Sequence, residues 1–364
     1  MVAKKRIISV DIFRGLTIAL MILVNTPGSW SHVYTPFLHA EWHGYTPTDL
    51  VFPFFLFIVG VSIVFAYPHK TMNAKVLKKL SIRSLKLIGL GLFLGAFTLS
   101  FPFFKDVAEI RFPGVLQRIG VVFFFTSVLF LNTNWRSLVV ISIVLLLGYW
   151  ILLEFVPVNG MASTLERAPH NLANFVDVKV FGNHNYKPDY DPEGLLSTLP
   201  SIATCLFGIF TGLILTSKQE KKTRLLVGIG GSMLLIGSLW DIFFPINKAL
   251  WTSSFVLVTA GWANILLALI YYGTDVKKIK FGKIFCYAGT NAITLYFLSS
   301  FIQKILNSLM VTDTTSVHEW LYQNIFVQEV ISLEASSLLY AIVVVAFYLV
   351  LAYIMYQKKI FIKV

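Results

Sequence analysis

The stretch that decides the fold is residues 10–67, which contains VDIFRGLTIALMILVN, then LHAEWHGYTPTDL, then VFPFFLFIVGVSIVFAY. Two apolar segments, about 7–25 and 49–67, enclose a polar loop, and each is close to the roughly 20 residues that a helix needs to cross a bilayer. We expect the pair to form a helical hairpin. Because a hairpin brings the two loop-side ends together at one membrane face, Asn25 and Asp49 should be neighbours there.

The loop between these segments is rich in groups that hold or move protons, and His39 lies on it between Asn25 and Asp49. Acyl transfer requires a base, a group that orients the base and a donor that stabilises the oxyanion. We therefore expect His39 to be the catalytic base or nucleophile. We expect Asp49 to hold one of its ring nitrogens and Asn25 to donate an amide hydrogen bond to the oxyanion. The simpler alternative is a solvated loop histidine.

A zinc site is another use for the histidines of this loop. His39 and His43 are four residues apart, which would put both on one face of a helix. Gly44 and Pro47 argue against a helix at this point, and the sequence offers no third ligand at a suitable spacing. We expect no metal.

Composition places the whole chain in a membrane. Of its 364 residues, 56% are hydrophobic and 13% are charged, whereas a soluble domain carries about 25% charged residues. Apolar stretches of span length recur throughout, so we predict a single all-α transmembrane domain over residues 1–364, a polytopic bundle of about ten helices. The expected spans are about 7–25, 49–67, 84–101, 114–131, 137–155, 194–216, 225–243, 252–272, 284–303 and 335–356.

The distribution of basic residues predicts the orientation. With the N-terminus in the cytoplasm, the cytoplasmic segments hold 20 Lys and Arg and the opposite loops hold 7. Because cytoplasmic loops are enriched in these residues, we expect both termini to be cytoplasmic. The main outer loops are then 26–48, 156–193 and 304–334. The basic residues are spread over short loops, which argues against nucleic acid as a partner despite the net charge of +12.

Two arginines fall within predicted spans. Arg14 lies one turn from Asp11 in the first span, and Arg118 follows Gln117 in the fourth. Ionisable residues inside membranes usually face the bundle interior and mark function. We expect Arg14, Arg118 and Gln117 to support the site of an anionic co-substrate. The structural alternatives are a self-neutralised Asp11–Arg14 pair and an interhelical hydrogen-bond cluster at Arg118.

The longest outer loop, 156–193, has the length of a lid or binding loop, with a short helix expected near 172–180. We expect four of its side chains to recognise hydroxyl or amine groups of an acceptor, namely Asp177, His184, Asp191 and Glu193. For the last two acids, capping of the following helix is the alternative. Trp42 and His43 on the first loop and Lys248 on a later outer turn complete the expected acceptor site.

Several blocks resemble one family in the same order: SVDIFRGLTIALMILVN, LHAEWHGYTPTDLVFPFFLFIVG, RFPGVLQRIG, YDPEGLLSTLPSI, PINKALWTSS and GTNAI. The chain is similar over nearly its whole length to the membrane domain of heparan-α-glucosaminide N-acetyltransferase and its bacterial relatives. In that family the histidine of the H-A-x-W block is catalytic, and His39 occupies this position; Asn25 and Asp49 also match family positions. His43 and Val178 depart from the family, which usually has Asn and Arg there.

The resemblance implies an acetyl-CoA-dependent N-acetyltransferase. The acetyl group would come from cytosolic acetyl-CoA, with phosphates held by basic segments at 68–83, 217–224 and 273–283. It would pass to the amine of a glucosamine-type sugar on the periplasmic or luminal side, at the inner membrane in a bacterium. The expected partners are an amino-sugar or glycosaminoglycan-derived acceptor, the lipid bilayer and, as an open alternative, a second copy in a homodimer. A transporter of amino sugars or oligosaccharides is the alternative function.

Overall fold

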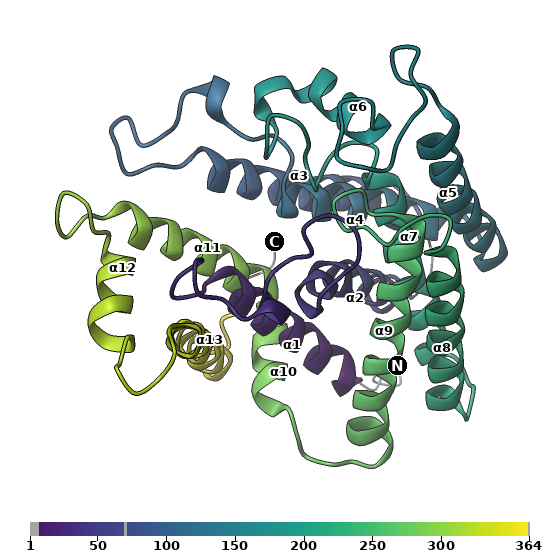
Figure 1. Cartoon of the computed structure of the whole chain (residues 1–364). Helices are drawn as coiled ribbons and strands as arrows, with labels where there is room; N and C mark the ends of the chain where they lie inside the picture. Colours follow the sequence, from purple (N-terminus) through teal and green to yellow (C-terminus); the bar gives the residue numbers. More distant parts are fainter. Residues whose placement is uncertain (1–6, 69–70, 363–364) are drawn as a thin grey trace.

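The computed structural model describes residues 7–68 and 71–362, which form helices and loops without a named strand (Figure 1). Within these residues, eight helices are long and apolar enough to cross a membrane. This confirms the prediction of an all-α polytopic membrane protein. The eight are α1 Ile8–Asn25, α2 Val51–Ala66, α4 Val115–Asn132, α5 Trp135–Phe155, α7 Thr198–Thr216, α8 Lys222–Trp240, α9 Ser253–Tyr271 and α13 Leu333–Gln357.

A ninth span is formed if the bent pair α10, Lys283–Thr290, and α11, Ala292–Ser308, is counted as one. The two helices meet at 81°. The bend lies at Asn291, whose side chain donates to the carbonyl of Ile360 at 2.9 Å and accepts from the N–H of Ile362 at 2.9 Å. These bonds tie the break to the end of the chain, so the bend is a packed feature of the fold.

The third predicted span, 84–101, is wrong in its position. The helix there is α3, Ala74–Ala96, and it is not among the described helices that meet the span criteria. It begins ten residues early because Asn73 caps it, accepting from the N–H of Val76 at 2.9 Å. Its first half is rich in lysine, which favours helix but interrupts the apolar pattern on which the prediction rested.

Glycines allow the central helices to approach closely. A Cβ on Gly15 would lie 1.8 Å from the carbonyl oxygen of Phe285, and one on Gly208 would lie 1.9 Å from that of Phe57. Pairs α1–α10 and α2–α7 therefore pack backbone to backbone, as small residues permit in membranes. The most apolar stretches of α2 and α9 are 72% and 78% buried, whereas that of α8 is 22% buried. Helices α2, α7 and α9 form the most buried part of the bundle, and α5, α8 and α13 lie at the periphery (Figure 1).

Two short helices lie in the predicted outer loops. Helix α6, Leu172–Phe181, confirms the helix expected near 172–180, and Asn171 caps it. In the second loop, α12, Val317–Leu321, is followed by the π-helical turn Tyr322–Phe326. Helix α6 lies at the end of the bundle at which α1 ends and α2 begins, because Trp42 of the loop between them packs in the same apolar cluster as Leu172 and Ala173 of α6. We call this the His39 end.

Candidate active site

His39 and Asp49 form a close pair at the His39 end. The Nδ1 atom of His39 lies 2.6 Å from Oδ1 of Asp49. The other carboxylate oxygen accepts from the backbone N–H groups of Ala40, at 3.0 Å, and Thr46, at 2.9 Å. Because Oδ1 is an acceptor, Nδ1 carries the proton and Nε2 presents its lone pair. The predicted orienting role of Asp49 therefore has the required geometry.

The local sequence explains why Asp49 is fixed. Thr46 and Asp49 form a capping box at the start of the 3₁₀ helix Pro47–Leu50, which leads directly into α2. The Asp49 side chain is fully buried, whereas that of His39 is 51% exposed. The carboxylate is thus fixed in position and shielded from water, whereas the ring that it holds remains accessible to a substrate.

Lys248 lies against the same histidine, although 209 residues separate them in the chain. Its Nζ is 3.0 Å from both ring nitrogens of His39 and 3.7 Å from Oδ1 of Asp49. Equal distances to both nitrogens place the ammonium beside the ring and out of line with the Nε2 lone pair. Burial lowers the pKa of Lys248, and the negative charges of Asp49 and Glu193 oppose that effect.

A rigid turn before α9 presents Lys248. Asn247 is fully buried; its Oδ1 accepts from the N–H of Leu250 at 2.8 Å, and its N–H donates to the hydroxyl of Thr252 at 3.0 Å. The turn is joined to the first loop because the N–H of Gly44 donates to the carbonyl of Ile246 at 2.7 Å. Lys248 is therefore placed by buried hydrogen bonds on both sides of the site.

A cavity of about 360 Å³ opens beside His39. Its lining combines aromatic rings with charged and amide groups, as in sites that bind small polar molecules. The polar and aromatic side chains among its described lining residues are Asn25, His39, Glu41, Trp42, Thr48, Phe52, Arg111, Tyr186, Tyr190, Glu193, Lys248 and Tyr296. The structure therefore brings Asn25, His39, Trp42, Glu193 and Lys248 together, as the sequence predicted.

Asn25 lies at this cavity without touching His39 in any described hydrogen bond. Its amide donates to the carbonyl of Met21 at 2.7 Å, within its own helix. An amide has two N–H groups, so one remains for a ligand. The position agrees with the expected donor role, which remains a prediction.

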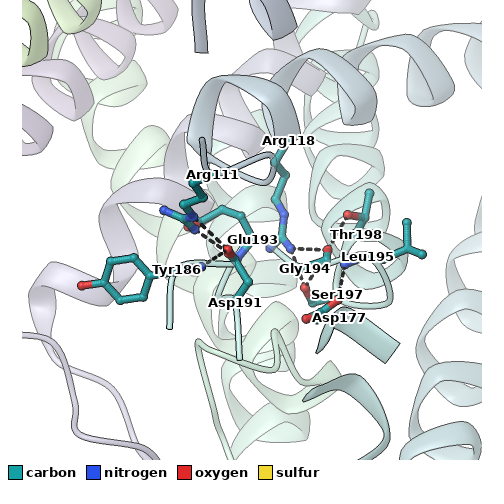
Figure 2. A network of polar contacts seen from close by, with 10 residues as sticks. All are labelled: Arg111, Arg118, Asp177, Tyr186, Asp191, Glu193, Gly194, Leu195, Ser197 and Thr198. Carbon is teal, nitrogen blue, oxygen red and sulfur yellow. Dashed lines mark hydrogen bonds and ion pairs between the residues drawn. The ribbon is translucent and has the colours of Figure 1, made fainter. Parts of the chain in front are cut away.

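An ionic cluster joins the long loop to the wall of the cavity, as Figure 2 shows. Arg111 donates to both carboxylate oxygens of Asp191 and to Glu193. Asp191 also accepts from the N–H groups of Tyr186, at 2.7 Å, and Glu193, at 2.9 Å. Burial alone would raise the pKa of Glu193, but the charges of Arg111 and Arg118 outweigh it and lower the pKa. Glu193 is therefore an anion at the cavity.

The second half of this cluster anchors α6. Arg118 donates to the carbonyl of Gly194 at 2.9 Å and to the hydroxyl of Ser197 (Figure 2). Asp177 accepts from the N–H of Leu195 at 2.7 Å. Burial, with the nearby charge of Asp191, raises the pKa of Asp177 to about 7. Arg118 and Asp177 thus hold the loop to the start of α7.

Several predicted site residues lie outside the cavity. Asp177, Asp191 and Arg118 are buried in the cluster of Figure 2, and the side chain of Gln117 packs against Gly91 and Gly114. His184 stacks on Phe112 with ring centroids 3.8 Å apart. His43 pairs with Glu166 at 3.1 Å. These side chains support the walls of the cavity, and their positions do not favour direct contact with a substrate.

Tyr186, which the sequence placed with Asp177 and His184 among the acceptor-binding candidates of the long loop, lines the cavity, whereas Arg111, Tyr190 and Tyr296 were not predicted there. Arg111 and Tyr190 lie in outer loops and carried a signal in their type, since aromatic rings and an arginine beside acids are typical of binding loops. Tyr296 lies inside an apolar segment, where its hydroxyl was the only sign. Their convergence depends on helix packing.

A second cavity, of about 620 Å³, lies at the opposite end of the bundle. Arg14 lines it, donating to the hydroxyl of Ser62 at 2.6 Å and to the carbonyl of Gly289 at 3.2 Å. Helix α3 supplies further cations, which are Lys75, Lys78, Lys79, Arg83 and Lys86. Of the three basic segments predicted to hold phosphates, 68–83 and its continuation in α3 line this cavity.

Comparison with known proteins decides the family. Residues 6–240 match the family model described as heparan-alpha-glucosaminide N-acetyltransferase, catalytic. The chain belongs to this family. It is 29% identical over 422 aligned residues to the heparan-alpha-glucosaminide N-acetyltransferases of Mus musculus and of Homo sapiens, each alignment covering 99% of this chain. The chain spans 60% of the length of these curated relatives.

The N-acetyltransferase family model covers most of the site. It includes His39, Asp49, Arg111 and Glu193, whereas Lys248 lies beyond residue 240, in the part that the two relatives cover. The matched range therefore includes the hairpin that carries the His39–Asp49 pair and the long loop 156–193.

Proposed function

We propose that this protein is a membrane N-acetyltransferase that moves the acetyl group of acetyl-CoA to the amine of a glucosamine-type sugar. The observation that carries the proposal is the His39–Asp49 pair, with Nδ1 held at 2.6 Å and the ring at the wall of a polar cavity, in a chain of this family. The same arrangement supports the assignment of His39, Asp49 and Asn25 as the catalytic residues. The transporter alternative is not favoured, because the relatives are named acetyltransferases.

The chemistry follows from this geometry. The acceptor amine attacks the thioester carbonyl carbon, its proton passes to Nε2 of His39, and the C–S bond breaks as the carbonyl re-forms. The imidazolium then returns the proton to the leaving thiolate. General-base catalysis by His39 is worth about 10²- to 10⁴-fold. The negative charge of Asp49 stabilises the protonated ring. Asn25 and the ammonium of Lys248 face the oxygen that becomes negative, and Glu193 and Trp42 receive the sugar.

The donor enters from the opposite end. Six cationic side chains surround the cavity of about 620 Å³ there, which suits the phosphates of a nucleotide; Arg14 is one of them. A hydrocarbon core is roughly 30 Å thick, so the pantetheine arm must extend through the bundle to reach His39. The 20-to-7 excess of basic residues supports a cytoplasmic donor end with both termini on that side. The acceptor site then faces the periplasm of a bacterial inner membrane, or a lumen.

The test compares purified wild type with His39→Ala, using acetyl-CoA and glucosamine. We expect His39→Ala to bind acetyl-CoA as tightly as wild type and to transfer at least about 100-fold more slowly. His43→Ala is the matched control, because His43 pairs with Glu166 outside the cavity. Near-normal turnover of His39→Ala, with loss in His43→Ala, would move the base to His43.

Labelled acetyl-CoA given without acceptor separates direct transfer from a covalent route. We favour direct transfer, because the thioester is already activated. Label retained on wild type and absent from His39→Ala would show instead that His39 carries the acetyl group.

A further inference from the structure

An apolar crevice of about 430 Å³ lies between α5 and α8, which are two of the peripheral helices. Helix α5 packs on α7 and helix α8 packs on α9, so the two outer helices leave a gap whose inner wall is α7 and α9. These four helices lie on one side of the bundle (Figure 1). Twelve of the fifteen described lining residues are apolar: Val139, Ile143, Leu146, Leu147, Phe207, Phe210, Ile214, Ile229, Met233, Ile236, Trp240 and Leu257.

The three polar side chains of the lining are hydrogen-bonded within the protein. Ser142 donates to the carbonyl of Leu138 at 2.9 Å. Thr211 donates to the amide oxygen of Asn264 at 2.7 Å, and the Asn264 amide donates to the carbonyl of Ala260 at 3.0 Å. A ligand in the crevice therefore gains its binding free energy from apolar contact.

The dimensions of the crevice fit one hydrocarbon chain. On α8 the lining runs from Ile229 to Trp240, a separation of eleven residues, which is about 16 Å at about 1.5 Å per residue. A hydrocarbon core is about 30 Å thick, so the crevice is about as long as one leaflet is deep. A second transmembrane helix is about 10 Å across, and about 16 Å of it would occupy roughly 1,300 Å³, far more than the crevice holds.

The bilayer supplies such a chain at this face. The most apolar stretches of α5 and α8 are 28% and 22% buried, so most of their surface faces lipid. An empty crevice would forfeit the dispersion contacts of its walls. An acyl chain from a neighbouring lipid restores these contacts and breaks no hydrogen bond of the lining.

Helix α5 is also joined to the turn that carries Lys248. The hydroxyl of Tyr149 donates to the carbonyl of Leu250 at 2.6 Å. The hydroxyl of Ser253 donates to the carbonyl of Leu146 at 2.7 Å, and Leu146 lines the crevice. A molecule in the crevice therefore contacts the helix that is bonded to both ends of this turn.

We propose that the crevice binds one acyl chain of a membrane lipid, and that this chain holds α5 against α7 and α9 and thereby keeps Lys248 beside His39. The lipid site stands on the crevice alone. Its effect on Lys248 rests on the proposed function, so the two parts have separate tests.

Native mass spectrometry of the full-length protein, delipidated in detergent and titrated with dioleoylphosphatidylcholine, tests the site without catalysis. Wild type should retain one lipid after the others are stripped. The filling variant Val139→Phe, Ile229→Phe narrows the crevice from α5 and from α8 and should retain none. The matched control Val343→Phe, Ile354→Phe places the same rings on exposed positions of α13 and should retain one.

Three results would overturn the lipid site. They are one lipid retained by the filling variant, no lipid retained by wild type, and a wild-type dimer that the filling variant dissociates. The last result would show that a second copy of the chain, and not a lipid, covers the crevice.

Acetyl transfer by the same proteins tests the effect on Lys248. Delipidated wild type should turn over about 10-fold more slowly and recover with the phospholipid, since a displacement of 1 Å costs up to about 100-fold. Its kcat/KM profile should lose activity at a higher pH on the acidic side, because the ammonium leaves His39. The filling variant, whose rings take the place of the chain, should be unaffected by lipid.

A lipid that binds wild type without changing turnover or the pH profile would refute the effect on Lys248 and keep the site. A lipid retained by wild type and lost from the filling variant, in a protein that transfers no acetyl group, would refute the proposed function and keep the site.

Discussion

At the scale of single residues, the least expected feature is the ammonium of Lys248 at 3.0 Å from both nitrogens of His39. A positive charge at this distance opposes protonation of the ring, whereas Asp49 at 2.6 Å favours it. Both charges act on the ring that the proposed mechanism uses to move a proton, so removing one of them should change the reaction.

Lys248→Met keeps most of the side-chain length and removes the charge. Because a neighbouring ammonium opposes a second positive charge, its loss should move the acidic limb of the kcat/KM profile to higher pH. The maximal rate should also fall, as one source of oxyanion stabilisation is lost. Lys248→Arg, which keeps the charge, is the control for the pH shift. An unmoved acidic limb in Lys248→Met would show that the ammonium does not act on His39.

At the scale of elements, α3 explains how the bundle carries a cationic cavity. Lys75, Lys78 and Lys79 lie on its first two turns and line the large cavity with Arg14. Replacing the three lysines by glutamine should weaken binding of acetyl-CoA by about 10-fold or more, and the loss should shrink at high salt. The acceptor affinity should stay unchanged, because these residues lie at the opposite end.

The matched control for α3 is Lys277→Gln with Lys280→Gln. These lysines belong to another predicted phosphate-binding segment, 273–283, and line neither large cavity among the described residues. Equal loss of acetyl-CoA affinity in both sets would mean that general surface charge, and not the α3 cavity, attracts the donor.

The α6 loop should respond to pH through Asp177. Its pKa of about 7 in the fold lies above its ordinary value of 3.8. The docked loop therefore keeps a proton that the opened loop has lost, and the free energy of opening falls as pH rises from about 4 to 7. Above that range Asp177 is ionised in both the docked and the opened loop, so the free energy of opening falls no further. The total decrease is of the order of a few kcal/mol.

Hydrogen exchange over residues 172–195, corrected for intrinsic rates, measures this opening. Wild type should show lower protection at pH 8 than at pH 5.5. Asp177→Asn keeps the acceptor for Leu195 without a charge, so its protection should stay level between the two. A wild-type loop equally protected at both pH values would contradict the raised pKa.

At the scale of the whole molecule, the two cavities lie at opposite ends of the bundle. Helix α3 runs between these ends, because its lysines line the larger cavity and its last residues, Leu94 and Gly95, accept from Lys304 near the His39 end. Together with the eight single-helix spans and the bent pair, α3 makes ten crossings of the bundle, which places both termini on the same side. The proposed reaction requires these ends to face different compartments. A cysteine introduced at Lys359 should react with a membrane-impermeant maleimide only after the membrane is opened, whereas one at Glu166 should react in intact cells. Variants should be made with Cys205 and Cys286 replaced. Labelling of Lys359→Cys in intact cells would invert the topology.

The helical membrane class, the first hairpin, helix α6 and the pairing of His39 with Asp49 could all be predicted from the amino-acid sequence. These features depend on local composition and on contacts across ten residues, which a capping box and a short loop specify. A side chain on a short loop stays close to the start of the helix that follows, because few residues separate the two.

The distant side chains that complete the site could be identified only once the packing of the helices was known. Lys248 and Tyr296 reach His39 and its cavity, Arg111 joins the acids of the long loop, and α3 brings its lysines to Arg14. These contacts depend on how far glycine lets helices approach and on where Asn291 bends the ninth span. Apolar segments of similar length pack in many orders with similar burial, so spacing along the chain cannot specify which of their polar residues meet.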